Sequence, residues 1–124
     1  MKVTDMQRLE RVEKMMVRWM CGVTLRDRLS SAELYRRVGV ESVADVVRRG
    51  RLRWFGHLER KDSTDWTSSC RNINIDGRRD RGRSKKTWDE CVRQDLKSLG
   101  QKKEWALERT SWRSLIGGKR PTCA

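Results

Sequence analysis

Apolar side chains recur at three- and four-residue spacing along much of this 124-residue chain, and the pattern predicts a mainly α-helical protein. The first helix is expected from about Asp5 to Cys21, with Thr4 and Gln7 at the spacing of a capping box and Gly22 as the stop. Its apolar face would consist of Leu9, Val12, Met16, Trp19 and Met20, opposite the basic residues Arg11, Lys14 and Arg18.

Two further capping signals predict the next helices. Ser30 with Glu33 opens a short helix that ends at Gly39, and Ser42 opens a longer one. That longer helix has one broad apolar sector, and Leu52 and Phe55 point away from it. Two apolar faces predict two packing partners, and we expect a preceding domain to supply one. The broad sector comprises Val43, Val46, Val47, Trp54 and Leu58.

The helix pair around Gly39 invites comparison with a helix-turn-helix, but Asp45 stands near a position that a recognition helix keeps apolar. After Asp62 the chain is polar, and Cys70 to Ile75 is interpreted as an extended strand or hairpin arm. The basic run from Arg71 to Lys86 carries a surplus of +5 and is expected to form a flexible loop, because its like charges repel one another.

Two helices are predicted after that loop, one opened by Thr87 with Glu90 and ended by Gly100, the other from Lys103 to Ile116. The chain is thus expected to be a small, basic, multi-helix domain or fragment with a flexible Arg/Lys-rich loop. It would also contain one short hairpin if the segment from Cys70 to Ile75 pairs with another strand. Its segments would be a helical part at 1–60, a polar linker and basic arm at 61–86, and a C-terminal helical pair with a frayed tail at 87–124. The six tryptophans are expected to lie mostly in the core.

The composition favours an anionic partner. The formal net charge is +13 and 38% of the residues are charged, against roughly 25% in ordinary globular domains. Nucleic acid is the simplest partner, and an anionic membrane surface is the competitor. The sequence has no apolar run near the ~20 residues of a membrane span and no signal-peptide core. We therefore expect a soluble, intracellular protein that does not engage a membrane.

Groups for metal binding or catalysis are sparse. Cys21, Cys70, Cys91 and Cys123 lack zinc-site spacing and are expected to be free thiols, and His57 is the single histidine. His57 could pair with Cys70 or Asp62, although packing or phosphate contact suits an arginine-rich helix better. The acidic pairs Asp89–Glu90 and Asp62/Asp65 are interpreted as helix-start or solvated groups instead of a divalent-ion site. No cofactor, no metal and no catalytic residue is predicted.

Two blocks that place arginine or lysine beside tryptophan carry the functional prediction, Arg51 to Asp62 and Gly77 to Trp88. One side of the long helix is expected to present a row of arginines, and the basic loop adds further cations. Trp66 is the candidate for base stacking, with a core or loop-anchor role as the alternative. The predicted nucleic-acid-binding residues are Arg48, Arg49, Arg53, Arg60, Trp66, Arg78, Arg79, Arg81, Arg83, Lys85 and Lys86. The other interpretation of these cations is a solvated charged face.

Four blocks, in order, resemble the region that follows the polymerase core in reverse transcriptases of non-LTR retrotransposons, of the LINE-like, RTE type. They are Met16 to Arg28, Arg51 to Arg60, Gly77 to Trp88 with Asp95 to Gly100, and Trp112 to Ile116. The chain departs from the family at Asp80 and Ser84, where proline is common. The resemblance implies a parent RNA-directed DNA polymerase, but the paired-aspartate motif of its active site does not occur here, since Tyr35 is followed by Arg36 and Arg37.

The expected function is therefore phosphate binding to RNA or DNA with low sequence selectivity and no activity of its own, in a nuclear or nucleocytoplasmic setting. Arg81-Gly82-Arg83 resembles a minor-groove arm, although an AT-hook would need proline at Ser84, and the same run suits a nuclear localisation signal. Two alternatives stay open. One is a structural element that packs on a polymerase thumb within a reverse transcriptase, and the other is a standalone DNA-binding regulator.

Overall fold

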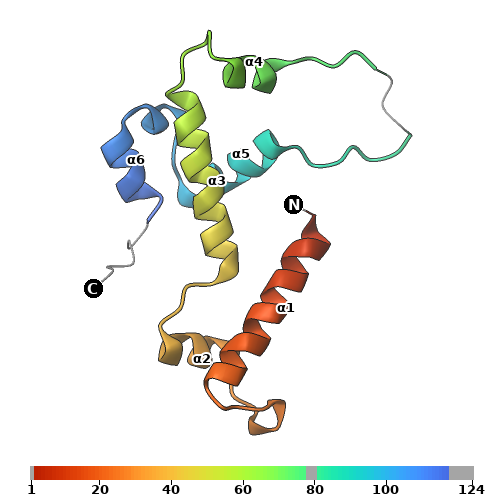
Figure 1. Ribbon diagram of the computed structural model, residues 1–124, viewed down its shortest axis with the longest axis vertical. Helices are drawn as coiled ribbons and strands as arrows, with labels where there is room; N and C mark the ends of the chain where they lie inside the picture. The colour runs from red at the N-terminus through yellow and green to blue at the C-terminus, as the bar shows by residue number, and fades with distance from the viewer. Residues whose placement is uncertain (1, 78–80, 118–124) are drawn as a thin grey trace. The chain divides into compact units, whose positions relative to one another are not determined.

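The computed structural model describes residues 2–77 and 81–117 and confirms a mainly α-helical chain, with no strand among those residues (Figure 1). In order, the helices are α1 (Val3–Met20), the 3₁₀ turn η1 (Leu25–Asp27), α2 (Ser31–Val38), α3 (Val43–Glu59), α4 (Trp66–Asn72), α5 (Trp88–Leu99), the 3₁₀ turn η2 (Lys103–Leu107) and α6 (Arg109–Leu115). The chain divides into two compact units, Met1–Arg48 and Arg49–Ala124. This division concerns packing, and the three segments proposed from sequence character stay a prediction.

The first unit is a small packing of α2 against α1. Val17 of α1 and Leu34 of α2 are its buried apolar residues. The hydroxyl of Tyr35 donates to the Glu13 carboxylate at 3.0 Å, and Arg18 Nη2 donates to the Leu29 carbonyl at 3.3 Å. Burial, and then the bond to Glu13, raises the pKa of Tyr35 to about 12.

Helix α1 differs from the prediction at its start and on its surface. It begins at Val3, with the Lys2 backbone N–H donating to Asp5, so the expected capping box of Thr4 and Gln7 is wrong. It does end before Gly22, which has a φ of +63°. The predicted apolar face is exposed in the described part of the chain, although the spacing is helical as expected. Its exposed members are Leu9, Val12, Met16, Trp19 and Met20.

The second unit has the larger core, where α3, α5, η2 and α6 meet (Figure 1). Its buried residues are Leu52, Phe55, Val92, Leu96, Ala106 and Trp112, with Trp88, Leu99 and Ile116 packed at the edge. The narrower face of α3, with Leu52 and Phe55, is therefore the buried one, whereas Val46 and Trp54 of the broad sector are exposed. The expectation of a mostly buried tryptophan set is also wrong, because Trp19, Trp54, Trp66 and Trp105 are all exposed.

The core depends on a close approach between α3 and α6. The indole Nε1 of buried Trp112 donates to the Leu52 carbonyl at 3.0 Å. The ring lies directly over Gly56, where a Cβ would come within 2.3 Å of Trp112 Nε1 and 2.5 Å of its Cδ1. Gly56 is thus the residue that leaves room for the tryptophan ring.

Local signals elsewhere have mixed outcomes. Ser30 and Thr87 accept from the backbone N–H groups of Glu33 and Glu90, and Gly39 and Gly100 end their helices in the left-handed region, as predicted. The hairpin expected at Cys70 to Ile75 is absent from the described residues, because α4 already includes Cys70 and the following residues form no ladder. The single helix expected over 103–116 is broken at Glu108, which has extended backbone and caps α6.

Candidate nucleic-acid interface

The positive charge of the chain is concentrated in the second unit. Residues 1–48 contain ten lysines and arginines against seven acidic residues, whereas residues 49–124 contain twenty against ten. The surplus is therefore +3 in the first unit and +10 in the second. A polyanion would meet most of its attraction on the second unit, which also contains nearly all of the predicted interface.

The arginines predicted as one row on α3 have different partners. Arg48 pairs with Asp45 at 3.1 Å, one turn earlier. Arg49 donates to the Gly117 carbonyl at 3.1 Å, and half-buried Arg60 donates to the Ala106 carbonyl at 2.6 Å. Arg53 is exposed and has no ion pair or hydrogen bond within residues 2–77 and 81–117. The structure thus gives three of the four arginines a contact within the protein, and Arg53 keeps its guanidinium in solvent.

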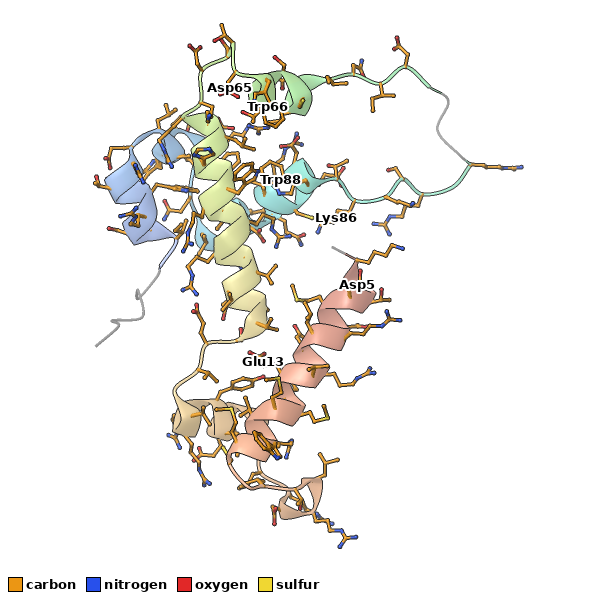
Figure 2. All side chains as sticks on the ribbon, viewed as in Figure 1. Asp5, Glu13, Asp65, Trp66, Lys86 and Trp88 are labelled. Atoms are coloured by element: carbon orange, nitrogen blue, oxygen red, sulfur yellow. The ribbon has the colours of Figure 1, made fainter. Side chains whose placement is uncertain are left out.

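The basic loop supplies the other solvent-facing cations. Arg81, Arg83 and Lys85 are exposed and pair with no group in the described residues. Lys86 donates to the side-chain carbonyl of Gln94, which leaves its charge unneutralised (Figure 2). The predicted contacts Arg78 and Arg79 lie outside the described residues. Together with Arg53, this gives five unneutralised cations among the predicted binding residues.

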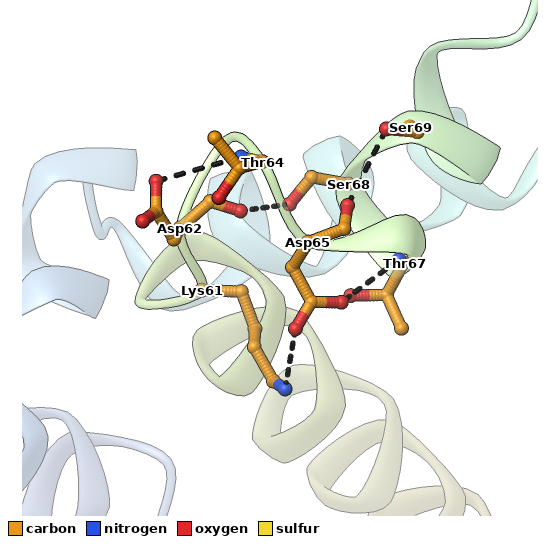
Figure 3. Close-up of polar contacts among 7 residues, drawn as sticks. All are labelled: Lys61, Asp62, Thr64, Asp65, Thr67, Ser68 and Ser69. Atoms are coloured by element: carbon orange, nitrogen blue, oxygen red, sulfur yellow. Dashed lines mark hydrogen bonds and ion pairs between the residues drawn. The ribbon is translucent and has the colours of Figure 1, made fainter.

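Trp66 is the first residue of α4 and is 73% exposed, so it is not a core residue (Figure 2). The sequence pattern did not predict a helix at Trp66, because α4 is short and polar. The helix is capped by Asp65, which accepts from the Thr67 backbone N–H at 2.9 Å and from Lys61 Nζ at 2.8 Å (Figure 3). The bonds from Lys61 and Thr67 hold the pKa of Asp65 well below its ordinary value. The ring therefore stands beside a carboxylate that is ionised at neutral pH.

Arg71 has a structural role that the sequence did not reveal. Its guanidinium bridges Glu59 at 2.6 Å and Asp89 at 3.2 Å, and lies 5.5 Å from the ring centre of Phe55. Burial alone would lower the pKa of Arg71, but the hydrogen bonds that it donates to the Glu59 and Asp89 carboxylates outweigh burial and raise the pKa. The basic run from Arg71 to Lys86 therefore loses its first member to the fold, and the Asp89 carboxylate is paired with Arg71.

A second buried-edge ion pair, from Arg51 to Asp95 at 2.7 Å, links α3 to α5. Asp95 interrupts the apolar stripe of α5, and that interruption was the signal for such a pair. Beside the Arg71 bridge lies a polar hollow of about 300 Å³. It is lined by Phe55, Glu59, Arg71, Asn72, Asp89, Val92, Arg93 and Lys103.

Other chemistry finds little support in the geometry. The ring of His57 contacts Trp54, with 5.2 Å between centroids, and neither Cys70 nor Asp62 bonds to it in the described chain. Within residues 2–77 and 81–117, no three His, Cys, Asp or Glu side chains gather where a metal ion could be held. Cys21, Cys70 and Cys91 are free thiols, and Cys123 lies outside the described residues. None of the described helices is long and apolar enough to cross a membrane.

Comparison with known proteins gives no relative from which a function could be transferred. No protein-family model matches the chain, and neither the curated proteins nor the solved structures contain a significant match.

Proposed function

We propose that this chain binds RNA or DNA through its phosphates, with low sequence selectivity and without a reacting centre of its own. The observation that carries the proposal is a set of five cations in the second unit that pair with no carboxylate of the described residues: Arg53, Arg81, Arg83, Lys85 and Lys86. Guanidinium and ammonium groups held in solvent on a unit with a surplus of +10 suit a phosphate backbone.

Low selectivity follows from the kind of groups available. Phosphate contacts set affinity and register but do not distinguish bases. The four unneutralised cations of residues 81–86 lie outside the described helices, whereas a helix or ribbon that fits the major groove is the usual means of reading base edges. The chain would therefore hold many sequences with similar affinity.

The origin of the chain belongs to the same proposal. The ordered blocks that resemble the C-terminal region of a LINE-like reverse transcriptase are consistent with a remnant that binds nucleic acid for a polymerase. Since a polymerase that copies RNA into a nick acts on chromosomal DNA, a nuclear or nucleocytoplasmic location accompanies this interpretation. The paired aspartates of such an enzyme do not occur in the sequence, so polymerase activity is not proposed for this chain.

The test is the dependence of affinity on salt. Five phosphate contacts predict that the logarithm of the binding constant falls against the logarithm of salt concentration with a slope of about −4.5 on duplex DNA and about −3.5 on single strands. Filter retention or fluorescence anisotropy of labelled oligonucleotides across a salt series measures both slopes. A folded chain that binds neither form of nucleic acid at low ionic strength would contradict the proposal.

One observation favours a second function, that of a structural element within a larger reverse transcriptase. The exposed apolar stripe of α1 is the kind of surface that another domain covers. Its exposed members include Leu9, Met16 and Trp19. On this alternative, hydrogen exchange of α1 should slow when a polymerase core is supplied, and binding to oligonucleotides by the isolated chain should be weak at every salt concentration.

A further inference from the structure

An aromatic pair stands on the solvent side of α3. The rings of Trp54 and His57 are 5.2 Å apart at their centroids with 32° between their planes. Trp54 is 51% exposed and His57 is also exposed, whereas Leu52 and Phe55 occupy the buried side of the same helix. The pair therefore contributes little to the core, and a flat face of the indole is available to a ligand.

The surroundings of this pair are open and cationic. Gly50 precedes Trp54 by one helical turn, the side toward which long helical side chains lean. A Cβ built at Gly50 meets nothing within 4 Å, so the described residues leave open space beside that position. Arg53, next in the chain to Trp54, is exposed and forms no ion pair with any described residue. An exposed aromatic ring can stack on a base, and a guanidinium beside it can pair with the phosphate of the same nucleotide.

We propose that Trp54, steadied by His57, is a stacking site for an unpaired nucleobase, and that Arg53 neutralises the adjoining phosphate. This inference rests on the proposed function and gives it a direction, because bases inside a duplex are already stacked and cannot reach an exposed ring. Stacking on one aromatic side chain changes affinity by roughly 5- to 150-fold. The chain should therefore prefer single strands by a factor in that range.

The charge environment separates this site from Trp66. Trp66 follows Asp65, whose ionised carboxylate caps α4, and Asp62 lies within the same turn (Figure 3). A nucleotide stacked on Trp66 would bring its backbone phosphates close to these carboxylates, which would repel them. Trp54 has Arg53 on one side and contacts His57 on the other, with no acidic residue between positions 46 and 58. For the same reason an apolar protein partner fits this surface less well than a nucleotide.

The experiment compares two strands and three variants of the full chain. The probes are a fluorescein-labelled single strand of about 16 nucleotides, the upper end of common site sizes, and the same backbone with abasic sites in place of bases. The variants are Trp54→Ala, Trp54→Phe and Trp105→Ala. Trp105 is the matched control, because it is 50% exposed, lies in the same unit and follows Glu104 instead of an arginine. Circular dichroism verifies that each variant is folded.

We expect Trp54→Ala to weaken binding of the ordinary strand by about 5-fold or more and to leave binding of the abasic strand unchanged. Trp54→Phe should retain most of the affinity, and Trp105→Ala should behave as the wild type. If Trp54→Ala does not fold, exposed His57→Ala replaces it, with a smaller loss that is again confined to the ordinary strand.

Two results would overturn the inference in distinguishable ways. Equal losses on the two strands, or a loss no larger than that of Trp105→Ala, would exclude base stacking at Trp54 while leaving phosphate binding intact. A wild-type chain that binds neither strand in dilute buffer would overturn the stacking site and the proposed function together.

Discussion

Replacing Gly56 by alanine is a direct test of the packing between α3 and α6. In most helix interiors this change is favourable, because alanine exceeds glycine in helix propensity by about 0.5–1 kcal/mol. At Gly56 the new Cβ would meet Trp112 Nε1 at 2.3 Å and Cδ1 at 2.5 Å. Ordinary carbon contacts are about 3.5–4.0 Å, so the indole must retreat by roughly 1 Å.

That retreat has two consequences for stability. It lengthens or breaks the 3.0 Å hydrogen bond from Trp112 Nε1 to the Leu52 carbonyl, and an unsatisfied buried donor costs about 1–3 kcal/mol. It also forces the ring into a core that already holds Phe55 and Leu52, and overpacking of this kind costs about 1–3 kcal/mol. After the gain in helix propensity is subtracted, we expect the variant to be less stable by about 1–5 kcal/mol.

The same helix offers the control. Gly50 lies six residues earlier on α3, and a Cβ there meets nothing within 4 Å. Gly50→Ala should therefore raise the free energy of unfolding by about 0.5–1 kcal/mol. Urea titrations followed by circular dichroism at 222 nm would compare both variants with the wild type. If Gly56→Ala stabilised the chain as much as Gly50→Ala does, the close approach of Trp112 to α3 would be disproved.

Two other predictions concern charged groups. Hydrogen bonds from Ser111 and Thr110 hold the pKa of Glu108 down to about 2, so its contribution to stability is complete above the ordinary value of 4.5 and is lost as the pH falls toward 2. Between those values the melting temperature of the wild type should fall more steeply than that of Glu108→Ala, and parallel curves would contradict the capping role. Arg71→Gln should lower the urea midpoint and leave the salt slope of binding unchanged, whereas Arg83→Gln should reduce the magnitude of that slope by about one and leave the midpoint unchanged.

The helices that sequence predicted well are those with local causes. The caps of α2 and α5 each need one hydroxyl and the backbone N–H three residues later, and Gly39 and Gly100 end their helices because glycine tolerates a positive φ. The break at Glu108 was missed for the opposite reason. Helical spacing continues through Glu108, and only the hydrogen bonds that its carboxylate accepts from the backbone of Thr110 and Ser111 show that a new helix begins there.

The sequence could not show which arginines and tryptophans pack in the core and which face solvent, because their partners are distant in the chain. Arg60 donates to a carbonyl at Ala106, and Trp112 is buried because Gly56 leaves room for its ring. Neither relation changes the spacing of apolar residues around α3, so the sequence predicted two packing faces without showing which one the core of this chain covers. Only Asp95, a carboxylate within an apolar stripe, left a visible sign of its partner Arg51.

These pairings explain why net charge alone overestimates the number of cations available to a phosphate. Arg51, Arg60 and Arg71 lie where α3 meets its neighbours, and each is bound by a carboxylate or a carbonyl. A phosphate that took one of them would have to replace that partner and loosen the core. Among the described residues, Arg53, Arg81, Arg83 and Lys85 have no partner for a phosphate to replace, and Lys86 has only the side-chain carbonyl of Gln94, so phosphate binding there does not oppose packing of the core. Replacing Arg53 or a cation of residues 81–86 should therefore weaken nucleic-acid binding, whereas replacing Arg51, Arg60 or Arg71 should lower stability. If the charge served only solubility, the first group of replacements would not affect binding.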